Sequence, residues 1–327
     1  MVKERILVLG DINMDALMQT PDLPPAGGGV VAQGMALRAG GSAANTAAVL
    51  AKLGAAVDLL GCVGQDAHAD AALAALAGAG VNLKHVQRRS DAPTGFIFIA
   101  VTPDGERTMF SFRGANVLLA AQNVPADIWQ GAALLHLSGF AFLDDPQRAA
   151  AWRALQLAEA AHVPMCLDTA LEPALLQPQE LRRLLPHLEI CITGMQEARA
   201  LLGVETPQAA AETLLQAGVN LAAVKLGAAG CLLACGSEQQ LCPRLPVRAV
   251  DSTGAGDAFS AGLLLAHSRR LNLSAAGLLA NAMGALAATV PGGGAALPGK
   301  SEAMAFLRGL TGVNEADRNQ VLQALGG

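Results

Sequence analysis

Short apolar runs of strand length alternate along this chain with longer helical patterns, and this alternation restricts the possible folds most strongly. Strands are expected at Ile6–Leu9, Val57–Val63, Ala133–Leu137, Met165–Asp168, Ile190–Thr193 and Leu221–Leu226. Helical patterns lie between them at Ala44–Leu53, Ala69–Ala77, Gln147–Ala161, Leu181–Leu185 and Gln196–Leu202. Such repetition buries a mostly parallel sheet between two helical layers, with ligands beyond the carboxyl ends of the strands. We predict a three-layer α/β/α fold.

Two stretches interrupt the alternation and indicate a second, smaller sheet. Residues 11–39 are rich in proline and glycine without a helical pattern, and the apolar stretches 95–102 and 107–112 flank Pro103-Asp104-Gly105, a hairpin signal. We expect residues of about 11–39 and 95–113 to form a small β lid over one edge of the site. From Ser252 onward the pattern is mainly helical, at Ala258–His267, Ala275–Ala288, Glu302–Leu310 and Glu315–Leu325.

Composition excludes several classes of protein. A net charge of −5 without a run of Lys and Arg argues against nucleic acid as a partner. Residues 271–299 carry no formal charge, but Pro291 and Gly292-Gly293-Gly294 interrupt them, so a buried helix and a glycine-rich loop are expected rather than a membrane span. Six cysteines without CxxC spacing and an N-terminal apolar run too short for export favour a reduced, cytoplasmic protein.

The segment Asp251-Ser252-Thr253-Gly254-Ala255-Gly256-Asp257-Ala258-Phe259 carries the chemistry, between a strand-like Val247–Val250 and an apolar helix. Its two glycines permit a turn whose amides converge at a helix N-terminus, where an anion is favoured. Asp257 would stand beside a bound phosphoryl group and take a proton from an attacking hydroxyl. Asp251 and Thr253 would serve as caps or bind a cation. Taken alone, Gly-x-Gly-Asp also fits an ordinary helix start with an N-terminal acid.

This segment resembles the C-terminal signature of the PfkB carbohydrate kinases, the ribokinase-like family. Gly40-Gly41-Ser42-Ala43-Ala44-Asn45-Thr46-Ala47 matches a second signature of that family, in the right order. Further similarity leaves only the last helix uncovered and runs through Gly10–Asp15, Gly61–Asp66, Arg113–Asn116 and Val224–Gly227. The resemblance implies one ribokinase-like domain over residues 1–327 and an ATP-dependent, Mg²⁺-requiring kinase that phosphorylates a hydroxymethyl group of a sugar, sugar acid or nucleoside.

The resemblance also implies roles for individual residues. Asp257 would be the general base, and the amides of Gly254, Ala255 and Gly256 would hold the charge on the transferred phosphoryl group. Matching positions imply sugar-hydroxyl contacts at Asn13, Asp15, Gly41 and Asn45, an ATP pocket at Lys225, Gly227 and Asn281, and a monovalent cation such as K⁺ at Asp251, Thr253 and carbonyls of Val290–Gly294. Arg113 either reaches a substrate or phosphate oxygen or is a solvated hairpin arginine. Relatives often dimerise through their lids, so a homodimer is expected.

Three departures from the family pattern bear on function. The Asn-x-x-Glu element that helps to place Mg²⁺ appears as Gly194-Met195-Gln196-Glu197, so Glu197 would act alone through water, with Asp168 as another nearby acid. This departure motivates an alternative, a non-catalytic sugar- or nucleotide-binding protein. Ser42 replaces a common lysine, and Leu135–Gly139 lacks a pocket glutamate. Both changes argue against ribose as the acceptor.

Other catalytic patterns fail on context. Gly294-Ala295-Ala296-Leu297-Pro298-Gly299-Lys300-Ser301 fits the Walker A pattern, but such a loop must follow a strand and precede a helix, and a later strand must supply an acid for Mg²⁺. We expect instead a connector that leads to a helix with Ser301 near its cap. No Gly-x-Gly-x-x-Gly follows the first strand, and the histidines show no metal-binding spacing.

Overall fold

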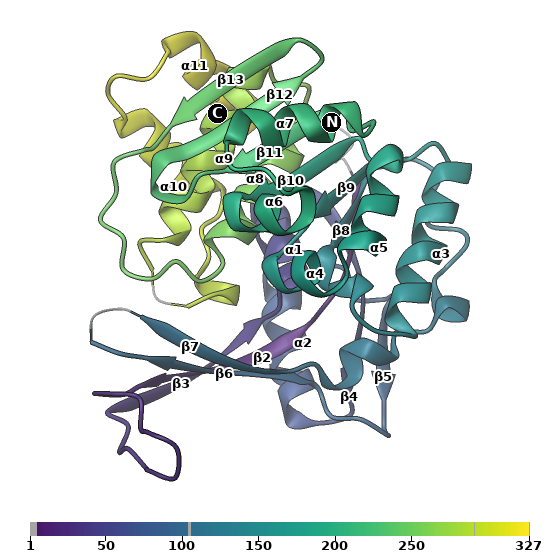
Figure 1. The fold of residues 1–327 in the computed structure, drawn as a ribbon, viewed down its shortest axis with the longest axis vertical. Helices are drawn as coiled ribbons and strands as arrows, with labels where there is room; N and C mark the ends of the chain where they lie inside the picture. Colours follow the sequence, from purple (N-terminus) through teal and green to yellow (C-terminus); the bar gives the residue numbers. More distant parts are fainter. Residues whose placement is uncertain (1–4, 104–105, 291, 327) are drawn as a thin grey trace.

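Two β-sheets of different size organise the protein, and the computed structural model describes residues 5–103, 106–290 and 292–326 (Figure 1). The larger sheet has nine strands, and β11 to β5 in its spatial order run parallel, while β12 and β13 add an antiparallel hairpin at one edge. In spatial order the strands are β13 (Glu238–Pro243), β12 (Gly230–Cys235), β11 (Leu221–Lys225), β10 (Ile190–Gly194), β9 (Met165–Asp168), β8 (Ala132–Ser138), β1 (Arg5–Leu9), β4 (Ala56–Gly64) and β5 (Val86–Arg89).

Helices cover both faces of this sheet because its strands are apolar on both faces. In β1, Ile6 and Val8 join one buried cluster, whereas Leu7 and Leu9 join the other. The first cluster is completed by α1 (Ser42–Lys52), α2 (Ala67–Gly78), α8 (Ala255–Ser268), α9 (Leu273–Ala287), α10 (Lys300–Gly309) and α11 (Glu315–Ala324). The second is completed by α3 (Gln147–Ala160), α4 (Leu171–Leu176), α5 (Pro178–Leu184), α6 (Met195–Leu202) and α7 (Pro207–Gln216). The predicted three-layer α/β/α architecture is confirmed.

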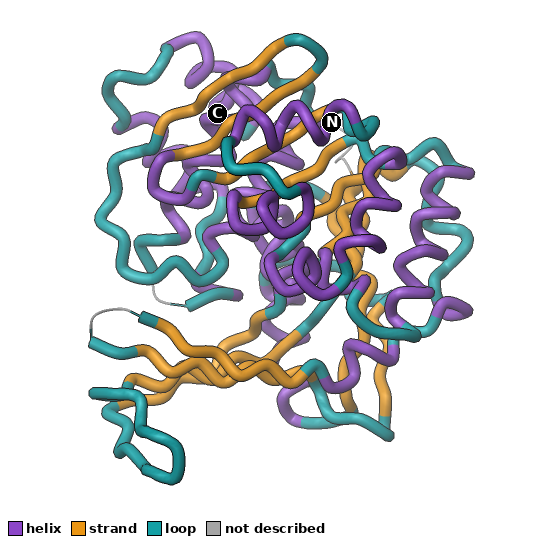
Figure 2. Tube along the Cα trace, viewed as in Figure 1, coloured by secondary structure: helices purple, strands orange, loops and turns teal. Residues whose placement is uncertain are grey.

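The smaller sheet, which we call the lid sheet, projects from one end of the larger sheet (Figure 2). Its order is β3 (Gly34–Gly40), β2 (Asn13–Gln19), β6 (Gly95–Val101) and β7 (Arg107–Phe112). Asp15 pairs across to Ile97, and Gln19 to Val101, which pairs to Arg107. The two-residue period of strands therefore places Asp15 and Arg107 on one face. The opposite face exposes Leu37 and Phe110.

Six short 3₁₀ helices connect the elements within the described part of the chain. They are η1 (Gly114–Leu118), η2 (Ala121–Asn123), η3 (Gly139–Phe142), η4 (Leu185–His187), η5 (Gly227–Ala229) and η6 (Gly294–Ala296). Of these, η3 directly follows β8 and η6 lies between α9 and α10.

The structure corrects one expected element. Residues 244–250 form no strand, although Val247–Val250 was predicted as one. Pro246 has no N–H to give to a ladder, and the N–H of Val250 donates to Ala288 O at the end of α9. The predicted hairpin turn at 103–105 lies mostly outside the described residues.

The uncharged stretch 271–299 contains a helix and a loop, as expected from the sequence. It contains α9 and, after it, a glycine-rich connection to α10. In the described ranges we find no helix with the length and apolar character that crossing a bilayer requires. The six cysteines, all within the described ranges, form no disulfide.

Candidate active site

The signature segment forms a tight turn at the start of α8. Gly254 is the N-cap of this helix and has φ 74°, a left-handed conformation that disfavours residues with a Cβ. Ala255 and Gly256 begin the helix, and Asp257 lies in its first turn. The first amides of an α-helix have no partner within the helix and form a preferred place for an anion. We call residues Gly254–Gly256 the anion turn.

Asp257 is fixed by two side chains from the start of α1. Ser42 Oγ donates to Asp257 Oδ1 and Asn45 Nδ2 donates to Asp257 Oδ2, both at 2.8 Å. The two family signatures therefore meet here, although more than 200 positions separate them, as the 212 between Asn45 and Asp257 show. Burial raises the pKa of Asp257 to about 6, and the two hydrogen bonds oppose that rise. A carboxylate with this pKa is ionised at neutral pH and remains a competent base.

Asn45 has a second hydrogen bond that was not foreseen from the sequence. Its Oδ1 accepts from the N–H of Gly294 at 2.9 Å, so its amide bridges Asp257 and the loop after α9. Gly41, the N-cap of α1, has φ 97°, and a Cβ there would lie 2.4 Å from the carbonyl oxygen of Asp11. Only glycine fits this position without displacing the backbone that leads into β2.

Asp15 and Asn13 lie on β2, the lid strand next to Asp257. Asp15 is only 4% exposed, and its Oδ1 is buried without a hydrogen-bond partner in the described structure. Burial, and then the charge of Asp257, raise the pKa of Asp15 to about 7. Asn116, whose role was not foreseen, donates from Nδ2 to Asn13 Oδ1 at 2.7 Å and accepts from the N–H of Ile12 at 2.8 Å. An unpaired buried oxygen of this kind fits a ligand that brings hydroxyl donors.

A cavity of about 690 Å³ borders the anion turn, with Ala255 and Gly256 in its wall. Lys225, Gly227, Gly256 and Asn281 contribute to its lining, which agrees with their expected place around a nucleotide. A Cβ on Gly256 would lie 3.6 Å from Lys225 Nζ, so this ammonium group stands directly beside the anion turn. Asn281 donates to the carbonyls of Cys242 and Pro243, both at 3.1 Å, and so holds the end of β13 against α9.

Asp168 is the buried partner of Lys225. Lys225 Nζ lies 2.9 Å and 3.0 Å from the two oxygens of Asp168, and Ser260 Oγ donates to Asp168 Oδ2 at 2.7 Å. Burial favours a neutral amine, but the charge of Asp168 raises the pKa of Lys225 above its usual value. The ammonium group is therefore held in place and charged, while the carboxylate of Asp168 is already engaged.

Two arginines of the cavity wall were missed by the sequence reasoning. Arg244 and Arg248 line the cavity in the irregular segment before the signature, and neither has an ion pair or hydrogen bond within the described ranges. In the sequence, only their position just before the signature points to these two arginines. The strand expected at Val247–Val250 does not predict side chains that line a cavity. Together with Lys225 they give the cavity a positive charge that suits a triphosphate.

Glu197 lies in the first turn of α6, beyond the end of β10. A Cβ on Gly194 would come within 2.2 Å of Glu197 Oε2, so this carboxylate fills the space above the glycine that replaces the family asparagine. Glu197 has no hydrogen bond or ion pair within the described part of the chain. A free carboxylate at the same sheet edge as Lys225, which pairs with Gly194 across the strands, fits a role in holding a water of Mg²⁺.

Asp251 and Thr253, which the family resemblance assigns to a monovalent cation, bind the side chain of Arg107. Arg107 of β7 donates from Nη1 to Asp251 Oδ1 at 3.2 Å and to Thr253 Oγ1 at 2.5 Å. Asp251 also accepts from Thr253 and from the N–H of Gly292. Burial opposes ionisation, but these hydrogen bonds and the charge of Arg107 hold the pKa of Asp251 below its usual value. Pro291, within the expected carbonyl loop Val290–Gly294, lies outside the described residues.

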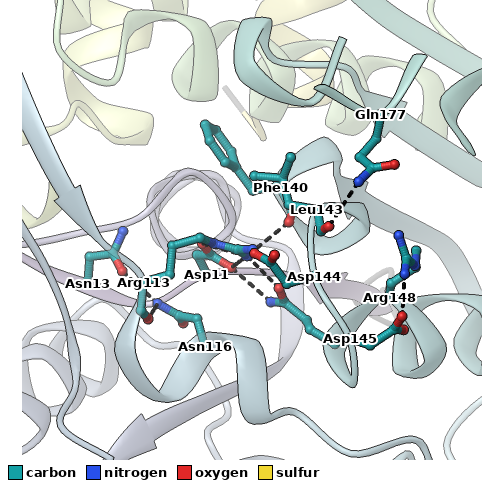
Figure 3. Close-up of polar contacts among 11 residues, drawn as sticks. Asp11, Asn13, Arg113, Asn116, Phe140, Leu143, Asp144, Asp145, Arg148 and Gln177 are labelled. Atoms are coloured by element: carbon teal, nitrogen blue, oxygen red, sulfur yellow. Dashed lines mark hydrogen bonds and ion pairs between the residues drawn. The ribbon is translucent and has the colours of Figure 1, made fainter. Parts of the chain in front are cut away.

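Arg113 lies beside Asp11, Asp144 and the carbonyl group of Phe140 (Figure 3), and its side chain is 17% exposed. Its guanidinium lies 2.9 Å from Asp11 Oδ1 and 2.7 Å from Asp144 Oδ2, and it donates to the carbonyl oxygen of Phe140 at 2.9 Å. Gln147 of α3 accepts a further hydrogen bond from Arg113 and donates to Asp11. Arg113 thus ties the base of the lid sheet to the segment between β8 and α3, and its hydrogen bonds leave it no free donor pair for a substrate.

The string that fits the Walker A pattern has another structure. Gly294–Ala296 form η6, and α10 begins at Lys300 after an irregular connection rather than after a strand. Glu302 Oε2 accepts from the N–H of Gly299 at 3.2 Å and caps this helix. No strand follows in the described residues, so the string is a helix start, as expected.

Comparison with known proteins shows which family and fold this chain resembles. The sequence pattern of the pfkB family carbohydrate kinases matches residues 3–300. A ribokinase from Haemophilus influenzae is 28% identical over 314 residues, covering 94% of this chain and 99% of the relative. Among solved structures, a ribokinase from Thermotoga maritima has a TM-score of 0.81 at 27% identity, covering 93% of this chain and 99% of that chain. Aminoimidazole riboside kinase from Salmonella enterica, solved with aminoimidazole riboside and an ATP analogue, has a TM-score of 0.80 at 25% identity, with coverage of 93% and 99%.

Proposed function

Because this chain belongs to the pfkB family of carbohydrate kinases, we propose that it transfers the γ-phosphoryl group of ATP to a hydroxymethyl group of a sugar, sugar acid or nucleoside. The relatives named above include kinases of ribose and of a riboside, which supports this range of acceptors. One observation carries the proposal: Asp257 stands in the first turn of α8, directly after the anion turn, and is held by Ser42 and Asn45.

In the proposed mechanism, Asp257 accepts the proton of the attacking hydroxyl. Its two hydrogen bonds orient both carboxylate oxygens, so the lone pair that takes the proton has a fixed direction. The amides of the anion turn and the ammonium group of Lys225 stabilise the charge on the transferred group. When bound, Mg²⁺ neutralises phosphate charge, and Glu197 would hold one of its waters. Asp257 returns the proton to solvent after transfer.

The acceptor and the nucleotide are assigned to opposite sides of Asp257. We assign acceptor contacts to Asn13, Asp15 and the backbone at Gly41, with Asn45 acting chiefly through Asp257. ATP is assigned to the cavity lined by Lys225, Gly227 and Asn281. The lid sheet would close over the acceptor and exclude water, which would otherwise accept the phosphoryl group.

We also propose that two copies associate through their lid sheets. The outer face of the lid sheet exposes large apolar side chains that a second copy could cover: Met35 is 66% exposed, Phe110 62% and Phe112 56%. Size-exclusion chromatography with light scattering tests this arrangement. A Phe110→Glu variant should elute as a monomer, whereas a dimer unaffected by this change would contradict it.

The kinase assignment is tested by ADP release from Mg·ATP with a panel of pentoses, hexoses, 2-keto-3-deoxygluconate and nucleosides. Turnover above background on any acceptor supports the proposal. Asp257→Asn should then lower turnover by about 10²–10⁴-fold, the usual contribution of a general base, with modest loss of ATP binding. Asp127→Asn, which changes an exposed carboxylate, is the matched control. Ligand-dependent melting shifts without turnover would favour the alternative of a non-catalytic binding protein, motivated by Gly194.

A further inference from the structure

Arg107, the first residue of β7, reaches from the lid sheet to the loop that precedes the anion turn. Its Nη1 contacts Asp251 Oδ1 at 3.2 Å and Thr253 Oγ1 at 2.5 Å, and its Nη2 donates to Ser252 Oγ at 2.6 Å. The side chain of Arg107 is 25% exposed and that of Asp251 is 12% exposed, so the pair is largely shielded from water. One guanidinium group therefore binds three consecutive side chains of the signature.

Of the oxygens that the family resemblance assigns to a monovalent cation, Asp251 Oδ1 and Thr253 Oγ1 already have hydrogen-bond partners. Asp251 Oδ1 accepts from Thr253 N at 2.8 Å and Thr253 Oγ1 at 2.7 Å as well as from Arg107, and Asp251 Oδ2 accepts from Gly292 N at 2.7 Å. Each oxygen of an ionised carboxylate offers about two lone-pair positions, so the three donors around Oδ1 occupy it fully, while the N–H of Gly292 takes one of the two positions on Oδ2. A K⁺ ion at Asp251 would have to displace the guanidinium or lie against it, where like charges repel strongly.

Arg107 also connects the lid sheet with the loop that precedes the anion turn. Arg107 lies on the same face of the lid sheet as Asp15, and it is 144 positions away from Asp251 in the sequence. Thr253 is followed at once by Gly254, whose left-handed conformation sets the direction of the anion turn. Holding residues 251–253 from the lid therefore fixes the backbone amides that begin α8.

We propose that Arg107 is a positioning residue that replaces the monovalent cation implied by the family resemblance: its tethered charge balances Asp251 and orders the loop that leads into the anion turn. The inference rests on the proposed function, because it assumes that the anion turn binds a phosphoryl group. On this proposal, the protein binds the nucleotide when Arg107 of the lid sheet is hydrogen-bonded to the signature. Nucleotide binding should then not depend on K⁺.

The test compares the full chain with Arg107→Met in KCl and in tetramethylammonium chloride at equal ionic strength. The affinity for Mg·AMP-PNP is measured by calorimetry, and thermal unfolding is followed without nucleotide. The natural chain should behave alike in both salts. Arg107→Met should lose about tenfold or more in AMP-PNP affinity in tetramethylammonium chloride, the effect of one lost charge-assisted hydrogen bond, and KCl should restore part of it. Arg88→Met, which removes an exposed partner of Asp70, should match the natural chain in every condition.

Two further measurements keep the inference decidable. Arg107→Lys retains the charge without the forked donors. Its affinity for AMP-PNP should therefore lie between that of the natural chain and that of Arg107→Met, and this affinity should be the same in both salts. A K⁺-specific rise in the melting temperature of the natural chain, or an Arg107→Met variant with unchanged affinity, would overturn the inference. If the natural chain bound no AMP-PNP, the proposed function would fail, whereas the salt dependence of thermal unfolding would still decide whether Arg107 occupies the cation position. Circular dichroism shows whether each variant is folded.

Discussion

Asn45 donates its side-chain amide to the Asp257 carboxylate at 2.8 Å and, with its other end, accepts from the N–H of Gly294 at 2.9 Å. A residue that the family resemblance assigns to the acceptor therefore also holds the proposed general base. Both ends of its amide are used, and the orientation of Asp257 depends on the loop that carries Gly294.

Removing this amide should disturb catalysis more than acceptor binding. In Asn45→Ala, Asp257 loses a hydrogen bond to its ionised form, so its pKa should rise and its carboxylate should lose its fixed direction. We expect kcat to fall about tenfold or more, with the acidic limb of the kcat profile displaced to higher pH and a smaller change in KM for the acceptor. Thr46→Val is the control, because Thr46 makes only a 3.4 Å contact with the Asp257 carbonyl. A rise in KM alone would assign Asn45 to the acceptor instead.

The rate of the natural enzyme should depend on pH through Asp257. With a pKa of about 6, the carboxyl is protonated and inactive as a base below that pH and ionised above it. We expect kcat at saturating substrates to rise between about pH 5 and 7 and then to level off. Steady-state rates in buffers of constant ionic strength measure this limb. A limb near pH 4, the value of an ordinary aspartate, would contradict the assigned environment.

Asp15 should make the protein less stable at high pH. Its pKa is about 7 in the folded protein against 3.8 for an ordinary aspartate, so the folded state binds a proton more tightly than the unfolded state does. Between these values the folded chain carries more protons, and stability therefore falls as pH rises, by up to roughly 4 kcal/mol in total. Asp15→Asn should raise the melting temperature at pH 8 and change it little at pH 4. An equal effect at both pH values would show that Asp15 is not buried as an acid.

Arg244 and Arg248 should contribute to ATP binding. Each lines the nucleotide cavity without a partner in the described structure, so each guanidinium is available for a phosphate oxygen. Arg244→Met and Arg248→Met should each raise KM for ATP by about tenfold, and the effect should shrink at high salt as exposed charges are screened. Arg199→Met, which removes a surface partner of Glu205, should leave KM unchanged. Unchanged KM in both cavity variants would mean that the triphosphate lies elsewhere.

Glu197 should determine the requirement for Mg²⁺. Glu197→Gln removes the charge that would hold a water of the ion and keeps the shape of the side chain above Gly194. We expect the Mg²⁺ concentration for half-maximal activity to rise about tenfold, the lower range for residues that act through a metal-bound water. Glu212→Gln, an exposed change on α7, serves as the control. An unaltered Mg²⁺ titration would indicate that the phosphates hold the ion without help from Glu197.

Local patterns were sufficient to predict the architecture and the anion turn. Period and spacing determine which residues form strands, and Gly254 to Asp257 are neighbours in the sequence, so their placement follows from a single helix start. The position of the lid strands could also be predicted from the sequence, because prolines and glycines break the helical pattern there. The strand expected at Val247–Val250 failed because an apolar run cannot show that its N–H groups have partners outside any sheet.

Contacts between distant segments could not be predicted. Asn45 and Asp257 each belong to a recognisable signature, but nothing in either signature indicates a hydrogen bond across 212 positions. The same holds for Arg107 with Asp251. It holds also for Arg113, whose partners Asp11 and Asp144 lie between β1 and β2 and in the segment before α3. These pairings depend on the tertiary arrangement of whole elements, which charge and periodicity do not encode.

The bridge from Asn45 to Gly294 has a consequence for the order of events during translation. Its two ends lie 249 positions apart, so the earliest strands and helices emerge from the ribosome long before the loop that completes the site. Nascent chains can begin to fold from the N-terminal side, yet Asn45, which holds Asp257, acquires its second hydrogen bond only when residue 294 has been added. A chain released before that point lacks the N–H that fixes the far end of the Asn45 amide, so its Asp257 carboxylate is held less firmly.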